Sequence, residues 1–216
     1  MKSILRALQY SRLIRRVYTK RYAKFGSQPA GIFWSNEQRQ LSRFKIILDQ
    51  IIFVQPTGSV SIADVGCGYG AMLHFIRANR AYNRLLYSGY DINPTLVKAC
   101  KSDARLPSQH FHVGDRPISS IDFSVMSGTY NMAVTSNVDE WEDYFFGCLE
   151  LCWRYSRKGM VFNLLCAEKS HISDGRLYYA NVQRIRGYCK ANFGITRVIR
   201  EPRLPSDVTF MVTRSH

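Results

Sequence analysis

A glycine-rich segment between an apolar run and a helical pattern constrains the fold most strongly. Residues 64–70 read DVGCGYG; they directly follow the apolar run 61–65 and precede the helical pattern 71–79. Glycine lets the chain turn sharply and lets a ligand approach the backbone. The free amide groups at the start of the helix favour an electronegative group. This order of strand, glycine turn and helix predicts the first unit of a nucleotide-binding α/β domain.

Short apolar runs alternate with helical patterns along the rest of the chain. We expect strands at 61–65, 86–90, 109–113, 122–126 and 159–165, helices at 71–79, 94–102, 141–155 and 182–192, and a closing pair of strands at 195–200 and 209–213. This alternation with short connections implies a parallel sheet covered on both faces. The predicted fold is α/β: a Rossmann-like, seven-stranded, mostly parallel sheet with helices on both faces and an N-terminal helical segment.

The N-terminal part is basic and is predicted to be helical. The first 36 residues contain no acid, and apolar side chains recur at helical spacing over residues 3–18, which predicts an amphipathic helix. The bases of this part are Lys2, Arg6, Arg12, Arg15, Arg16, Lys20, Arg21 and Lys24. Such a concentration of charge attracts phosphate, nucleic acid or an anionic membrane surface. A second helix is expected over 36–52, with Ser35 as its N-cap.

The six cysteines form neither a CxxC pair nor a cluster with zinc spacing. We therefore expect free thiols in the core, no metal site, and a reducing compartment, with the cytoplasm as the default. No apolar run approaches the about 20 residues that a membrane helix needs. The basic, amphipathic N-terminus is also compatible with peripheral membrane association or an organellar presequence.

An acid follows the second predicted strand. Asp91 lies 21 residues after Gly70, and ligands of open parallel sheets bind at the carboxyl ends of the strands. A carboxylate there can accept hydrogen bonds from both hydroxyls of a ribose, which nicotinamide and adenosylmethionine cofactors share. The glycine pattern is DxGxGxG rather than the GxGxxG that seats a pyrophosphate, and Asp64 suits a cationic, amino-acid-bearing ligand better than a pyrophosphate.

Three segments together resemble the class I S-adenosylmethionine-dependent methyltransferases. IADVGCGYG resembles the first motif of that family, YSGYDINP the second, and HFHVGD, ending at Asp115, the third-strand segment whose acid meets the adenine amino group. The resemblance spans roughly residues 30 to 214. It implies a methyltransferase that uses S-adenosyl-L-methionine, with a basic helical extension at 1–30 and a class I methyltransferase domain at 31–216. A nicotinamide enzyme and a Rossmann-like domain without a ligand are the alternatives.

The resemblance also implies which residues bind the cofactor. The glycines would line its methionine side, Asp91 would hold the ribose, and Ile92 would pack on the adenine. Arg43, in a leading helix that resembles those of small bacterial methyltransferases, would pair with the methionine carboxylate. The full predicted cofactor set is Arg43, Asp64, Gly66, Cys67, Gly68, Gly70, Asp91, Ile92, Asp115, Arg116 and Ser127.

The acceptor pocket is expected after the fourth and fifth strands and beside the N-terminal segment. The predicted catalytic residues are Tyr130, Asn131 and His171, of which His171, expected in a loop, is the candidate base. Further candidates to line the pocket are Trp34, Asn163, Tyr178 and Tyr179.

The segment after the fourth strand narrows the acceptor class. It reads SGTYN, without the Asn/Asp-Pro-Pro-aromatic run of enzymes that methylate base amino groups, and no cysteine lies near it. The favoured acceptor is a small molecule or a glycan-like compound, methylated on oxygen or nitrogen, and an anionic acceptor would fit the formal net charge of +14. The alternative is an RNA or protein methyltransferase that docks through residues 2–24. The sequence indicates neither the acceptor itself nor an oligomeric state.

Overall fold

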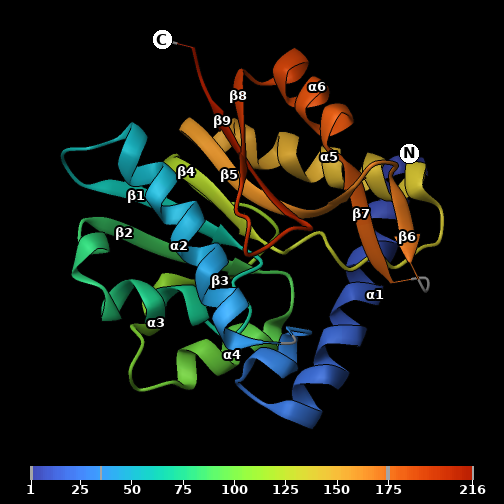
Figure 1. Ribbon diagram of the computed structural model, residues 1–216. Helices are drawn as coiled ribbons and strands as arrows, with labels where there is room; N and C mark the ends of the chain where they lie inside the picture. Colours follow the sequence, from blue (N-terminus) through green and yellow to red (C-terminus); the bar gives the residue numbers. More distant parts are fainter. Residues whose placement is uncertain (1, 35, 174–175, 216) are drawn as a thin grey trace.

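The computed structural model describes residues 2–34, 36–173 and 176–215 (Figure 1). Its centre is a nine-stranded sheet in which β1 to β5 run parallel in the order β3-β2-β1-β4-β5. The strands are β1 (Val60–Val65), β2 (Leu85–Asp91), β3 (Phe111–Val113), β4 (Ile121–Ser127), β5 (Ser156–Ala167), β6 (His171–Ser173), β7 (Leu177–Asn181), β8 (Ile195–Arg200) and β9 (Asp207–Thr213). On the far side of β5, β9 pairs antiparallel with β5 and with β8. The predicted mostly parallel sheet is confirmed.

Two strands were not predicted. β6 and β7 form an antiparallel ribbon, and the end of β7 pairs with the end of β5. His171 therefore lies in a strand rather than in the expected loop. The third strand begins at Phe111 and not at residue 109 as predicted, because residues 108–110 form a 3₁₀ turn before β3.

Within the described residues, six α-helices accompany the sheet. They are α1 (Lys2–Phe25), α2 (Glu37–Val54), α3 (Ala71–Ala78), α4 (Pro94–Ser102), α5 (Val138–Tyr155) and α6 (Val182–Asn192). The side chains of Asn36, Asn93, Asn137 and Asn181 cap the first turns of α2, α4, α5 and α6 by accepting a backbone amide hydrogen. The predicted cap of α2 was therefore wrong by one residue, since Asn36 takes that role; Ser35 lies outside the described residues.

The helices cover the two faces of the sheet in two groups. Residues of α2, α3 and α4, among them Ile47, Met72 and Val97, share one apolar cluster with the sheet. Residues of α5 and α6, among them Phe145 and Ile185, form the cluster on the other face. The connection from β3 to β4 contains no helix. Both faces bury apolar side chains, as a parallel sheet requires.

The N-terminal helix α1 continues to residue 25 and packs against α4 and α5. The hydroxyl of Tyr10 donates to Glu140 at 2.8 Å, and the hydroxyl of Thr19 lies 3.0 Å from the side-chain nitrogen of Asn93. After α1, Gly26 adopts a φ of +68°, a conformation that glycine tolerates without strain. The chain then turns back through a 3₁₀ helix, η1 (Pro29–Ile32), held by the Arg21 guanidinium, which donates to the Ala30 carbonyl. Helix α1 thus bridges the two halves of the sheet.

The cysteines are all free. Among the described helices, none has a stretch long and apolar enough to cross a bilayer. Within the same residues, no group of three or more His, Cys, Asp or Glu side chains is arranged to hold a metal ion.

Candidate functional site

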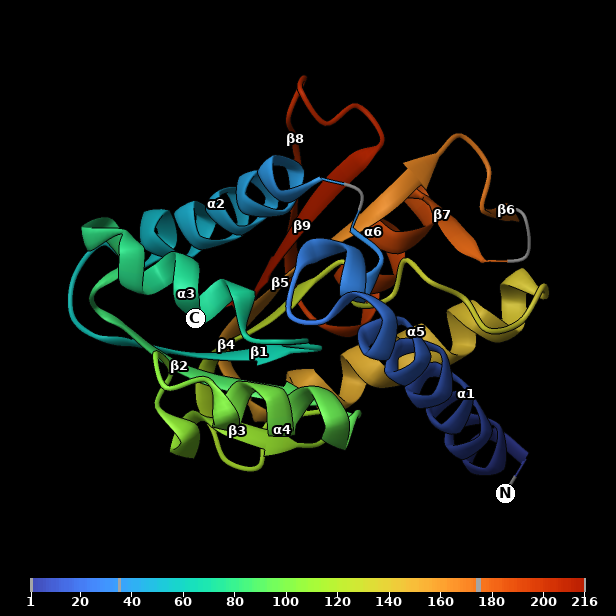
Figure 2. The same cartoon turned by 90° about the horizontal axis from the view of Figure 1, so that it is seen from below.

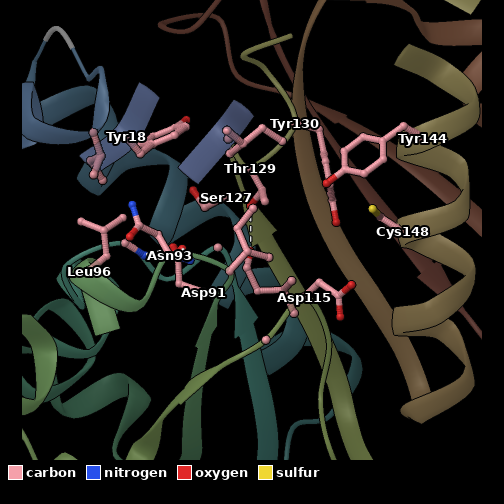
Figure 3. A pocket seen from close by; sticks show the side chains of 18 of the residues that line it. Tyr18, Asp91, Asn93, Leu96, Asp115, Ser127, Thr129, Tyr130, Tyr144 and Cys148 are labelled. Carbon is pink, nitrogen blue, oxygen red and sulfur yellow. Dashed lines mark hydrogen bonds between the residues drawn. The ribbon is translucent and has the colours of Figure 1, made fainter. Parts of the chain in front are cut away.

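A cavity lies at the carboxyl ends of β1, β2 and β4 (Figure 3). Its lining comes from α1 (Ile14, Tyr18), the segment before α2 (Ile32, Trp34), the glycine loop (Val65, Gly66, Gly68), the β2–α4 region (Asp91, Ile92, Asn93, Leu96), the turn after β3 (Gly114, Asp115), the segment after β4 (Ser127, Gly128, Thr129, Tyr130) and α5 (Tyr144, Cys148). Side chains from both halves of the sheet therefore meet there.

The glycine loop forms the floor of the cavity. Gly66 and Gly68 have φ values of +82° and +59°, which only glycine adopts readily. A Cβ atom on Gly66 would lie 2.6 Å from Thr129, whose hydroxyl donates to the Val65 carbonyl. Gly70 also has a positive φ, but a Cβ there would meet Leu106 in the core rather than the cavity. Cys67 is buried and does not line the cavity.

Asp91 lies at the tip of β2 and holds the glycine loop in place. One carboxylate oxygen accepts the Gly68 amide hydrogen at 3.0 Å, and the other accepts that of Asn93 at 2.8 Å. Each carboxylate oxygen has two lone pairs, so each keeps one for a ligand. Burial raises the pKa of Asp91 to about 6, against the lowering effect of the two amides and of Arg15. The group is thus a buried acceptor that loses its charge in mildly acidic solution.

Asp64 lies beneath the glycine loop rather than in the cavity wall. It is buried and accepts a hydrogen bond from the Tyr87 hydroxyl at 2.8 Å. Burial raises the pKa of Asp64 to about 7, the Tyr87 hydrogen bond lowers it, and the nearby charge of Asp91 raises it. Two buried carboxyl groups close to the cavity favour a ligand that carries positive charge.

Of the other predicted residues on the adenosine side, some line the cavity and one does not. Ile92, Asp115 and Ser127 line the cavity. The guanidinium of Arg116 lies 2.7 Å from the Asp115 carboxylate, but Arg116 is not part of the cavity wall. The Ser127 hydroxyl is buried and has no hydrogen-bond partner among the described residues. A buried hydroxyl without a partner is costly, so Ser127 points to a polar group supplied by a ligand.

Arg43 belongs to a buried polar network next to the cavity. It forms an ion pair with Asp207, and its guanidinium lies 4.2 Å from the centre of the Trp34 ring. Asn163 links this pair to the segment after β4, because its amide donates to Asp207 and its carbonyl accepts from the Gly128 amide at 2.8 Å. The Nε atom of Arg43 has no partner among the described residues. Burial lowers the pKa of Arg43, while Asp207 raises it.

The three predicted catalytic residues do not come together. Tyr130 lines the cavity, and burial raises its hydroxyl pKa well above the usual value. Asn131 lies behind it and accepts the backbone amide hydrogen of Leu165 at 3.0 Å. His171 is exposed on β6, stacks on Tyr179 with ring centres 4.9 Å apart, and does not line the cavity. This geometry gives His171 no route to a ligand in the cavity.

Tyr178, which was expected to line the acceptor pocket, does not line the cavity and instead links secondary-structure elements. Its side chain is fully buried, and its hydroxyl donates to Glu142 at 2.8 Å. Glu142 is paired in turn with Arg184. This network links β7 to α5 and α6, and the Tyr178 hydroxyl donates its hydrogen within it.

The sequence did not indicate the cavity-lining residues that come from helices α1 and α5. Tyr18 of α1 lies across the cavity from Tyr144 and Cys148 of α5 (Figure 3), and Ile14 of α1 also lines the cavity. Burial and the charge of Asp91 raise the pKa of Tyr18. Tyr18 follows Ile14 by four residues on the apolar stripe of α1, and that spacing was the available signal. Asp207 was missed as well, since its contact with Arg43 exists only once β9 has paired with β5.

No family model matches the chain. A Mycobacterium tuberculosis protein named "Putative methyltransferase Rv1506c" is 33% identical over 137 residues, which cover 62% of this chain and 80% of that protein.

Solved structures provide a second comparison. An N1-methyltransferase for 1,6-didemethyltoxoflavin from Burkholderia thailandensis is similar with a TM-score of 0.61 and 11% identity, covering 96% of this chain and 89% of the other. The amino pentose methyltransferase CalS10 from Micromonospora echinaspora gives 0.60 and 16%, covering 92% and 97%. Magnesium protoporphyrin IX methyltransferase from Synechocystis PCC 6803 gives 0.59 and 15%, with both chains fully covered. These likenesses show the same fold. Together with the mycobacterial relative, they establish that the chain belongs to the class I S-adenosylmethionine-dependent methyltransferases.

Proposed function

We propose that the chain binds S-adenosyl-L-methionine in the cavity and methylates a small-molecule or glycan-like acceptor on oxygen or nitrogen. The observation that carries the proposal is the pair of acceptor sites left on Asp91, facing a cavity whose floor is Gly66 and Gly68. The unpartnered Ser127 hydroxyl supports a polar ligand at the same place. The three neighbours described above are named for acceptors that are themselves small molecules.

The proposed cofactor roles follow from the family resemblance and from the positions of these residues in and beside the cavity wall. Asp91 accepts from the ribose hydroxyls, Ile92 packs on the adenine, and Asp115 accepts from the adenine amino group. Gly66 and Gly68 allow the methionine part to approach the backbone. Arg43 has a free Nε and a guanidinium oriented by Asp207 and Trp34, which suits a role beside the methionine carboxylate.

S-adenosyl-L-methionine supplies a methyl group that is already activated on a sulfonium. The chain therefore has to align the acceptor with that methyl group and keep water away, and positioning alone can lower such a barrier substantially. Tyr130 keeps its proton at neutral pH because burial raises its pKa, so we assign it to donating a hydrogen bond to the acceptor. Helix α1 closes the cavity through Ile14 and Tyr18.

We also propose the division of the chain into a basic extension (1–30) and a methyltransferase domain (31–216). The division follows the charge and the extent of the family resemblance. Because α1 packs against α4 and α5, the extension is a wall of the active site as well as a charged surface.

A transfer assay tests the acceptor class. The protein is incubated with methyl-labelled S-adenosyl-L-methionine and cell extract that has been separated into small-molecule, RNA and protein fractions. We expect label in the small-molecule fraction. Label that appears only in the RNA or protein fraction would contradict the proposed acceptor while leaving the cofactor assignment intact.

Cofactor affinity should fall in mildly acidic solution. Asp91 must be ionised to accept from both ribose hydroxyls, and its pKa in the free protein is raised to about 6. Below that pH its protonation opposes binding, so affinity for S-adenosylhomocysteine should fall by up to about tenfold per pH unit. Calorimetry at several pH values between 5 and 8 measures this. The Asp91→Asn variant should show a much flatter profile, and an equally steep profile in that variant would place the titrating group elsewhere.

A further inference from the structure

The outer side of α1 differs from the side that lines the cavity. Leu5, Leu8, Arg12, Arg16 and Lys20 follow one another at spacings of three or four residues, and all five are exposed. Residues that recur in this way share one side of a helix. Figure 2 shows α1 at the edge of the molecule, with its amino end directed away from the sheet. We call the side formed by these five residues, extended by Arg15 and Lys24, the basic face of α1.

Apart from Arg15, whose charge acts on Asp91, the bases of the basic face are not neutralised by other described residues. Among the described residues, the ion pair of α1 is that of Arg6 with Glu140, at 3.3 Å. Arg12, Arg16, Lys20 and Lys24 take part in no ion pair within that part of the chain. The first 36 residues contain no acid, so the helix itself cannot provide a partner. The face is therefore complementary to an extended anionic surface.

At the amino end of the helix, the basic face begins with two exposed apolar side chains. Leu5 is 66% exposed and Leu8 is 52% exposed, although both belong to an ordered helix. Helices that lie in the interface of a bilayer combine exposed apolar side chains with bases that reach the phosphate groups. Surfaces that bind single-stranded RNA instead offer aromatic side chains on which bases stack, and the basic face has none.

We propose that the basic face of α1 binds the surface of an anionic phospholipid bilayer. Leu5 and Leu8 enter the boundary between headgroups and acyl chains, while Arg12, Arg16 and Lys20 contact the lipid phosphates. The opposite side of the same helix carries Ile14 and Tyr18 in the cavity wall. The enzyme thus docks through the helix that closes its active site.

Vesicle co-sedimentation of the full chain tests the proposal. The probes are vesicles of phosphatidylcholine alone and of phosphatidylcholine mixed with phosphatidylglycerol. We expect binding to the mixed vesicles, little binding to the neutral ones, and weaker binding as salt is added. The variant Arg12→Gln/Arg16→Gln/Lys20→Gln should bind the mixed vesicles at least about tenfold more weakly, since each base near the surface contributes.

A matched control separates the basic face from total charge. The variant Arg154→Gln/Arg186→Gln/Lys190→Gln also removes three exposed bases, but from α5 and α6, and it should bind as the unchanged protein does. Leu5→Ser/Leu8→Ser keeps every charge and should still lose several-fold in affinity. Equal losses in the two charge variants, or equal binding to both kinds of vesicle, would overturn the proposal. So would binding of an RNA oligonucleotide that depends on the basic face, without any binding to vesicles.

The vesicle experiment is independent of the proposed catalytic function, because it needs neither cofactor nor acceptor. S-adenosylhomocysteine affinity, measured by calorimetry on the same variants, shows that each is folded. A failure to bind vesicles with intact affinity for S-adenosylhomocysteine rejects the docking surface alone. Vesicle binding without such affinity in the unchanged protein rejects the cofactor assignment alone.

Discussion

Replacing Gly68 by valine is expected to reduce affinity for S-adenosylhomocysteine by up to about 100-fold, since extra methyl groups in a closely packed site cost roughly 1–3 kcal/mol. A Cβ atom at this position lies 3.1 Å from Ile32, so the valine methyl groups would enter the cavity. The amide of Gly68 also donates to Asp91, and a φ of +59° strains any branched residue. The steric clash and the backbone strain therefore affect the glycine loop and not the sheet.

Isothermal titration calorimetry measures the loss, and circular dichroism checks the fold. Gly187→Ala is the matched control, because a Cβ atom at that position in α6 has no neighbour within 4 Å. It should bind S-adenosylhomocysteine normally and be slightly more stable, as expected for alanine within a helix. A Gly68→Val protein that is folded and binds normally would show that the ligand does not lie on this loop.

The Asp91→Ala variant should bind S-adenosylhomocysteine about 10- to 150-fold more weakly, which corresponds to about 1.5–3 kcal/mol for the loss of charge-assisted hydrogen bonds. Two effects combine in this variant. The ribose hydroxyls lose their acceptor, and the amides of Gly68 and Asn93 lose theirs. Calorimetry at pH 7.5, where Asp91 is ionised in the unchanged protein, gives the comparison.

The Asp91→Asn variant distinguishes a ligand-binding role from a purely structural one. The folded-state pKa of Asp91 is raised, so its ionisation costs folding stability as pH rises from about 4 through about 6. The Asn side chain carries no charge but keeps only one acceptor oxygen for the two backbone amides, so its two effects on folding stability oppose each other. The melting temperature at pH 7.5 should therefore change little, while affinity for S-adenosylhomocysteine falls. If the variant lowers the melting temperature and leaves affinity intact, Asp91 only holds the loop.

Sequence patterns predicted most of the sheet because glycine-rich turns and helical patterns separate its apolar strands. The glycine loop and the alternation of apolar runs with helices were sufficient for β1 to β5. The ribbon of β6 and β7 was missed because β6 has only three residues, one of them an exposed histidine. Such a short strand forms because β7 provides its partner, not because its own residues favour it.

Some of the predicted cofactor residues lie at or just after the end of a strand, and the structure places these in the cavity wall. Asp91, Asp115 and Ser127 were expected to bind the cofactor, and all three line the cavity, while their roles stay a prediction. The ion pair of Arg43 with Asp207 could not be anticipated, because it joins α2 to β9 and depends on the register between β5 and β9. The periodicity of α1 predicted a helix, but periodicity does not identify the surface against which a helix packs.

The position of α1 also bears on the acid strength of Asp91. Ile14 and Tyr18 help to keep water from the carboxylate, and burial is the largest cause of its raised pKa. Whenever the first 25 residues move away from α4 and α5, solvent reaches Asp91 and its pKa returns toward the ordinary range. The opening of this helix would then be detectable as a release of protons.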